Sequence, residues 1–211
     1  MRFLESAPGR YDRGMRWLTL GRVDEIRAAV ASAVPAVESP AVLEIGCGTG
    51  ALTALLIARG AQVTAFDQNP EMLEHAHERV GDSPKCEILE RTASEIDRLA
   101  DASFDAVVAS FSFSEMSAPE RHFVLSQAAA KLRPEGRLAI ADEVRPRSTW
   151  ARLVFALLRA PQAALGWLAV GSVSRPLAAL EAELEAAGFR TLEQQEWLGG
   201  HLALFVAARA G

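Results

Sequence analysis

The stretch V-L-E-I-G-C-G-T-G at residues 42–50 constrains the fold of this chain more than any other. An apolar run contains an acid near its end, three glycines then alternate with small residues, and residues 51–59 have a helical pattern. This order predicts a strand, a tight turn and the start of a helix. The turn requires glycine because a Cβ atom would hold a ligand away from the backbone. The N–H groups that begin the helix would face that ligand, which predicts a site for a nucleoside-containing cofactor.

Short apolar runs and helical stretches alternate along the rest of the chain. We expect strands at 41–45, 62–66, 85–90, 104–109, 136–141, 189–197 and 201–208. We expect helices at 20–34, 51–59, 70–80, 119–132, 150–169 and 176–187, and a short helical turn at 94–99. Nearly continuous apolar strands between helices predict a parallel sheet that is covered on both faces. Because few residues join the last two strands, we expect that pair to be antiparallel.

Composition narrows the class of protein. A chain of 211 residues, half of them hydrophobic, predicts one domain with an ample core. The net charge of −5 argues against a dedicated nucleic-acid binder. The two cysteines, Cys47 and Cys86, do not have metal-ligand spacing. The first residues lack the apolar core of a secretion signal, so we expect a cytoplasmic protein.

The glycine pattern alone leaves two classes of cofactor open. Gly46-x-Gly48-x-x-Ala51 also satisfies the dinucleotide pattern, which makes an NAD-linked oxidoreductase an alternative. Glu44, two residues before Gly46, instead suits a ligand that carries an amino group and a sulfonium. Asp67 ends the second strand, where its carboxylate can accept both hydroxyls of a ribose.

With these residues, the segment from Ala41 to Asp142 resembles the class I S-adenosylmethionine-dependent methyltransferases, in the ubiquinone and menaquinone methyltransferase-like branch. The resemblance implies a Rossmann-like α/β fold with a seven-stranded, mostly parallel sheet and an antiparallel C-terminal strand. It also implies that S-adenosylmethionine is the cofactor and S-adenosylhomocysteine the product. The residues expected at the cofactor are Tyr11, Glu44, Gly46, Cys47, Gly48, Gly50, Asp67, Gln68, Met72, Thr92, Ala93, Ser94 and Ser110.

One feature departs from the family pattern. Members often carry an aspartate on the adenine amine after the third strand, whereas this chain has Thr92 at that point. We expect Thr92 or Ser94 to contact the adenine instead. The opening segment with Tyr11, the stretch around Ser112 and that around Asp142 also resemble a subgroup described as corrinoid-protein-associated methyltransferases.

The methyl group of such a cofactor is already activated, so transfer by in-line displacement depends largely on positioning and requires no metal. A base helps only when the acceptor arrives protonated. Glu115, Asp142 and Glu143 follow the fourth and fifth strands and are the candidates for that role. Glu115 has a structural alternative as the cap of the following helix, and Asp142 as an ion-pair partner of Arg145. A module that binds the cofactor without catalysis is a further alternative.

Two segments should flank this core within a single domain of residues 1–211. We expect residues 1–34 to form helices that cover the cofactor, and residues 144–187 to form a basic, apolar, helical flap. The apolar stretch 150–173 contains Arg152, Arg159 and Pro161, which argues against a membrane span. The flap could be a solvated helix edge, a lid, a homodimer contact or a weak membrane-surface contact through 145–175. As a lid, it would favour a small apolar or anionic acceptor.

Overall fold

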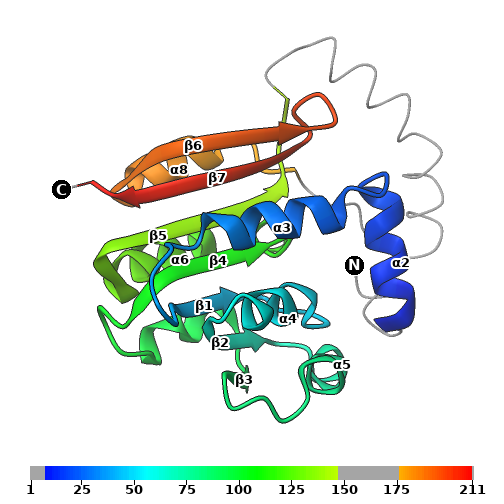
Figure 1. The fold of residues 1–211 in the computed structure, drawn as a ribbon. Coiled ribbons are helices and arrows are strands. Elements are labelled where there is room, and N and C mark those ends of the chain that lie inside the picture. The colour runs from blue at the N-terminus through cyan, green and yellow to red at the C-terminus, as the bar shows by residue number, and fades with distance from the viewer. Residues whose placement is uncertain (1–7, 147–175, 211) are drawn as a thin grey trace.

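The computed structural model describes residues 8–146 and 176–210, which form one twisted sheet with helices on both faces (Figure 1). Seven strands lie in the order β3-β2-β1-β4-β5-β7-β6. β7 pairs antiparallel with both β5 and β6, and the other neighbouring strands pair in parallel. The α/β fold and the antiparallel C-terminal strand expected from the sequence are therefore confirmed. The strands are β1 (Ala41–Ile45), β2 (Gln62–Asp67), β3 (Cys86–Glu90), β4 (Phe104–Ser110), β5 (Leu132–Glu143), β6 (Phe189–Trp197) and β7 (Leu202–Arg209).

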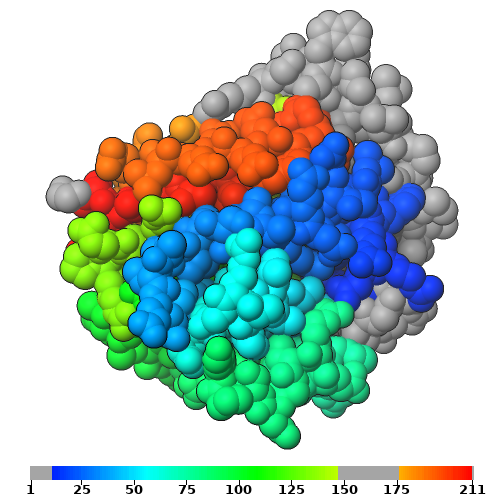
Figure 2. All heavy atoms as spheres, viewed as in Figure 1, coloured from blue at the N-terminus to red at the C-terminus, as the bar shows by residue number. Residues whose placement is uncertain are grey.

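Two helical layers enclose this sheet. The helices α3, α4 and α5 cover one face, and α6 and α8 cover the other (Figure 1). Figure 2 shows α3 and α4 laid across the sheet, with β6 and β7 forming a band beside them. Each layer has its own buried apolar cluster against the sheet. The helices are α2 (Pro8–Leu18), α3 (Val23–Ala33), α4 (Ala51–Ala58), α5 (Pro70–Val80), α6 (Ala118–Lys131) and α8 (Leu180–Ala186), with short 3-10 turns η1 (Ala93–Arg98) and η2 (Phe113–Glu115).

The order of the strands places the site. β1 lies between β2 and β4, so the chain leaves β1 toward one edge of the sheet and returns on the other side of β1. Ligands of open α/β sheets bind in the crevice at such a switch point, beyond the carboxyl ends of the strands. In this chain the glycine loop, the end of β2 and the loop after β4 meet there.

Three expected boundaries differ from the structure for local reasons. The helix expected from residue 20 begins at Val23, because Leu20 and Gly21 have φ values of 49° and 83°, which end α2. The helix expected from residue 176 begins at Leu180, because Leu177 forms a bridge to Val144. The strand expected from residue 136 begins at Leu132, where its pairing with β4 is irregular and shifts between Phe104 and Ala106.

The greater part of the expected flap, residues 147–175, lies outside the described residues. The interpretations of that segment as a lid, a dimer contact or a membrane contact therefore stay predictions. Within 8–146 and 176–210, no helix combines the length and the hydropathy that crossing a membrane requires.

Candidate cofactor and active site

The glycine loop joins β1 to α4 and is attached to the end of β2. The N–H groups of Gly46 and Cys47 both donate to the carbonyl of Phe66, at 2.9 and 3.0 Å. Gly46 has a φ of 72°, and a Cβ atom there would lie 2.5 Å from the Cβ of Ser112. Gly50, which begins α4, has a φ of 73° and would bring a Cβ within 3.0 Å of Ala76 on α5. Both conformation and close packing therefore require glycine at these positions.

Asp67 is the acid that ends β2. One oxygen of its carboxylate accepts from the N–H of Gly48 at 2.8 Å, and the other accepts from the N–H of Asn69 at 3.0 Å. Each carboxylate oxygen has a second lone pair, so this side chain can still accept from a ligand. Since the two backbone donors fix the carboxylate, Asp67 is held in place beside the glycine loop.

Three neighbouring cavities follow the loop, with volumes of about 280, 140 and 20 Å³. Gly46 lines all three, and Asp67 with Gln68 lines the first two. Among the expected residues, the largest cavity is lined by Tyr11, Gly46, Gly48, Asp67, Gln68, Met72, Ser110 and Glu115. Ala93 reaches the second cavity, and Glu44 and Cys47 reach the smallest. Five expected residues line none of these three, namely Gly50, Thr92, Ser94, Asp142 and Glu143.

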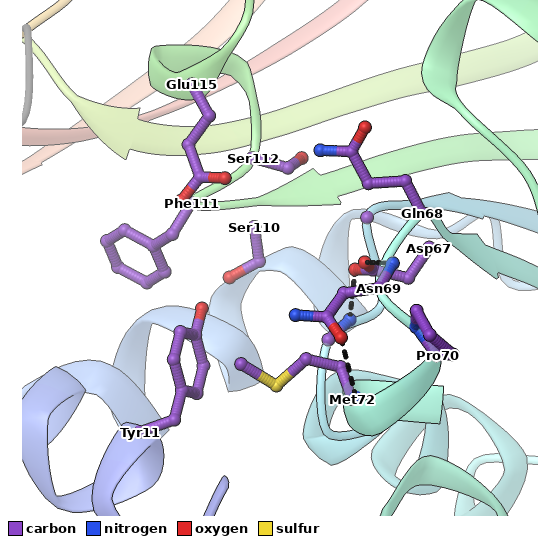
Figure 3. Close-up of a pocket in the computed structure, with 12 residues that line it drawn as sticks. Tyr11, Asp67, Gln68, Asn69, Pro70, Met72, Ser110, Phe111, Ser112 and Glu115 are labelled. Carbon is purple, nitrogen blue, oxygen red and sulfur yellow. Dashed lines mark hydrogen bonds between the residues drawn. The ribbon is translucent and has the colours of Figure 1, made fainter. Parts of the chain in front are cut away.

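Two different walls face each other across the largest cavity (Figure 3). Asp67, Asn69 and Pro70 form a wall of polar and backbone groups on the side of β2 and α5. The opposite side carries the ring of Phe111 and the carboxylate of Glu115 from the loop after β4, with the Tyr11 ring below them. The cavity therefore has a polar side suited to a sugar and a more aromatic side with one acid.

A buried acid and an arginine lie together at the smallest cavity. Glu44 is 2% exposed and accepts from the hydroxyl of Thr53 at 2.7 Å. Burial raises the pKa of Glu44 to about 8, although the Thr53 hydrogen bond and the charge of Arg27 act in the opposite direction. Arg27, from α3, lines the same cavity with its side chain 12% exposed. A ligand group with both a positive and a negative charge would complement this pair.

Helix α2 is attached over the loop by an ionic network. Asp12 accepts from Arg79 of α5 at 2.6 Å and from the Thr49 hydroxyl at 3.1 Å. Burial disfavours its charged form, but Arg79 and Arg27 outweigh that cost and hold the pKa of Asp12 below its usual range. Tyr11, the neighbouring residue, is thereby placed above Gly48. Burial, reinforced by the charge of Glu115, raises the pKa of Tyr11, so its hydroxyl stays protonated and available as a donor.

The loop after β4 is bound to the end of β1. The hydroxyl of Ser112 donates to the carbonyl of Ile45 at 2.8 Å, and Phe111 has a φ of 61°, a conformation that non-glycine residues seldom adopt. Strained backbone of this kind clusters at functional sites. Ser110 lines the largest and the smallest cavities, and its buried hydroxyl has no hydrogen-bond partner among residues 8–146 and 176–210.

Glu115 and Asp142, two of the three candidate bases, have different positions. Glu115 is exposed and lines both larger cavities. The interpretation of Glu115 as a helix cap is wrong, because Ser117 caps α6. Asp142 is 1% exposed and accepts from the N–H groups of Glu143 at 2.7 Å and Ser114 at 3.0 Å, so backbone donors take the place expected for Arg145. Burial raises the pKa of Asp142 to about 6, with those hydrogen bonds acting against it.

Thr92 and Ser94, the residues expected near an adenine, are used within the turn that begins η1. Their hydroxyls lie 2.9 Å apart, and the N–H and hydroxyl of Thr92 donate to Glu95 at 3.0 and 3.3 Å. This capping box stabilises the turn while Ala93 alone of the three lines the second cavity. The structure adds two lining residues that no local motif of the sequence marks, Arg27 of α3 and Glu120 of α6.

Comparison with known proteins finds methyltransferases among the proteins most similar to this chain. Residues 42–136 match the family model described as a methyltransferase domain. The chain is 29% identical over 207 residues to a demethylmenaquinone methyltransferase of Clavibacter sepedonicus, covering 92% of this chain and 83% of that protein. It is 35% identical over 148 residues to an uncharacterized methyltransferase of Mycobacterium tuberculosis, covering 70% of this chain and 55% of that protein.

These matches and the fold support a class I S-adenosylmethionine-dependent methyltransferase.

Solved structures of methyltransferases share the fold of this chain. A methyltransferase of Haloferax volcanii, solved in complex with the Trm112 activator, aligns with a TM-score of 0.72 at 17% identity, covering 100% of this chain and 97% of that one. A 1,6-didemethyltoxoflavin N1-methyltransferase of Burkholderia thailandensis, solved with its substrate and S-adenosylhomocysteine, aligns with a TM-score of 0.65 at 19% identity, covering 97% and 91%. The finer resemblance to corrinoid-protein-associated methyltransferases stays a prediction.

Proposed function

We propose that this chain binds S-adenosylmethionine along its three cavities and transfers the methyl group to a small-molecule acceptor. The observation that carries the proposal is the continuity of the cavities past Gly46, with Asp67 fixed at their junction. Glu44 and Arg27 at the smallest cavity match the ammonium and carboxylate of an amino acid. Asp67 matches the two hydroxyls of a ribose.

The cofactor would supply an electrophilic methyl group that needs no further activation. The protein's part is to hold that group in line with an acceptor and to exclude water. Ser110 offers an unpartnered buried hydroxyl between the amino-acid end and the main cavity. Tyr11 and Phe111 supply ring surfaces on the acceptor side, which suits a flat apolar substrate.

Of the three candidate bases, we assign a direct role to Glu115 alone. Its carboxylate lies in the wall opposite Asp67, where it can take a proton from an acceptor. Asp142 and Glu143 line none of the three cavities, and Asp142 positions the loop after β4 by accepting from the N–H of Ser114. The preference for an apolar or anionic acceptor rests on the arginines of 145–175 and on the lipid-like quinone named in the relatives.

Isothermal titration of the chain with S-adenosylmethionine, S-adenosylhomocysteine and NADH tests the cofactor. We expect heat from the first two and none from NADH, because Glu44 and Arg27 match an amino acid rather than a second nucleotide. Binding of NADH alone would overturn the proposal in favour of an oxidoreductase.

Release of S-adenosylhomocysteine in the presence of a panel of quinones, phenols and carboxylates tests the transfer. We expect turnover with at least one flat apolar acceptor, and loss of most of that turnover in Glu115→Gln with unchanged cofactor affinity. Tight cofactor binding with no release across the panel would instead favour a module that binds without catalysis.

A further inference from the structure

The second cavity, of about 140 Å³, carries two opposite charges that do not meet. Arg91 lines it from the loop after β3, and Glu120 lines it from the first turn of α6. Among the ion pairs of the described residues, none joins these two side chains. A cation and a carboxylate that border one small cavity without pairing leave room for a polar group between them.

Arg91 has a donor that lacks a partner. Its Nη1 atom is buried and makes no hydrogen bond in the described part of the chain. A buried polar group without a partner is costly, and the cost is larger when the group is charged. The N–H of Arg91 donates to the carbonyl of Asp67 at 3.0 Å, which fixes the start of this side chain beside the acid that we assign to the ribose.

Glu120 is held by a well-anchored helix start. One of its oxygens, Oε2, accepts from the N–H of Ser117 at 3.4 Å in a capping box. The next residue, Arg121, donates to the carbonyl of Met116 at 2.8 Å and to both oxygens of Glu183 at 2.7 and 2.6 Å. The other oxygen of Glu120, Oε1, makes no hydrogen bond within the described part of the chain, so it can accept from a ligand.

We infer that Arg91 and Glu120 read the edge of the adenine base, an inference that rests on the proposed cofactor. Adenine presents an amine donor at C6 beside an acceptor at N1, so a carboxylate and a guanidinium that border the same small cavity supply the complementary acceptor and donor. Asp67 lines both larger cavities, so a ribose bound there directs its base into the second one. Glu120 of α6 thus takes the role that the family resemblance gives to an acid after β3, where this chain has Thr92.

Titration with two nucleosides tests the inference. Hypoxanthine reverses the pattern, with an acceptor at C6 and a donor at N1, so S-inosylhomocysteine should bind about 10- to 100-fold more weakly than S-adenosylhomocysteine. Glu120→Gln keeps the capping box, because glutamine serves at that position, and adds a donor for the C6 oxygen. Arg91→Met removes the donor that opposes N1–H. We expect either variant to bring the two affinities within about threefold.

Glu185→Gln on α8 and Arg190→Met on β6 are the matched controls, since both residues are exposed and line none of the three cavities. They should keep the wild-type ratio. Equal affinity of the wild type for both nucleosides, or an unchanged ratio in both Glu120→Gln and Arg91→Met, would overturn the inference while leaving the proposed function intact. No heat from either nucleoside would overturn the proposed function, and the inference with it.

Discussion

Asp67 and Asp142 are carboxylates at the ends of two strands of the same sheet, and their surroundings differ in one respect. In both, each oxygen accepts one backbone N–H, from Gly48 and Asn69 in the first and from Ser114 and Glu143 in the second. Asp67 borders two cavities, whereas Asp142 is 1% exposed and lines none of the three described. The difference shows that an acid at a strand end is available to a ligand only if a cavity opens beside it.

Replacing Asp67 is the strongest test of that comparison. Asp67→Ala removes the acceptor for both ribose hydroxyls, and hydrogen bonds to a charged group contribute about 1.5–3 kcal/mol each. We expect the Kd for S-adenosylhomocysteine to rise at least about 100-fold, measured by isothermal titration. Asp82→Ala, at an exposed position after α5, should leave the Kd unchanged. A rise of less than about threefold in Asp67→Ala would show that this acid does not bind the sugar.

The same replacement at Asp142 should act on stability instead. Asp142→Ala leaves the buried N–H groups of Ser114 and Glu143 without an acceptor, at a cost of about 2–3 kcal/mol in the free energy of unfolding. Guanidinium denaturation measures that loss, and isothermal titration should show a Kd within about threefold of the wild type. If Asp142→Ala were fully stable and yet inactive, Asp142 would be a catalytic residue and the comparison would fail.

The sequence predicts those parts of the site that depend on local conformation. The glycine loop could be found because the φ of Gly46 and its contact with Ser112 exclude a side chain. The end of β2 could be found because an apolar run meets an acid and then Pro70 at a helix start. Burial and partners made across the fold leave no such local sign. The sequence alone therefore could not separate Asp142 from Glu115.

The remaining parts of the site arise from elements that are distant in the chain. Arg27 lines the smallest cavity from α3, and Glu120 of α6 lines the second cavity together with Arg91. Neither residue lies in a motif, and each side chain alone has the pattern of a solvated helix face. Their roles follow from the order of the strands, which the sequence predicts only in outline. The contact of Asp12 with Arg79, 67 residues apart in the chain, could not be predicted for the same reason.

Glu44 sharpens the comparison, because it is buried like Asp142 and lines a cavity like Asp67. The pKa of Glu44, about 8, lies above the ordinary value of 4.5. The stability that the protonated side chain contributes to the folded state is therefore fully present below pH 4.5 and is lost as the pH rises through 8. Glu44→Gln mimics the protonated acid. Without ligand, it should match the wild-type Tm at pH 4 and exceed it by at least about 3 °C at pH 8.5, corresponding to at least about 1 kcal/mol.

The substitution that raises the Tm should also lower the affinity for S-adenosylhomocysteine. A bound ammonium would favour the charged form of Glu44, so we expect Glu44→Gln to bind S-adenosylhomocysteine about tenfold more weakly at pH 8. Equal Tm values of variant and wild type at pH 8.5 would show that burial does not raise the pKa of Glu44 in the ligand-free protein.

The smallest expected effect concerns α2, the helix that lies over the glycine loop beside the cavities. Asp67 borders cavities over which α2 is held by Asp12 and Arg79, and the Arg79 side chain is 35% exposed, so solvent weakens this ion pair. Arg79→Met should speed dissociation of S-adenosylhomocysteine about threefold, measured by stopped-flow fluorescence, because α2 then opens more often. Arg133→Met breaks a pair of similar length and exposure, with Asp105, away from the cavities, and should leave that rate unchanged. Equal dissociation rates in Arg79→Met and Arg133→Met would show that α2 does not limit the release of S-adenosylhomocysteine. Asp67 and Asp142 would then differ in burial alone.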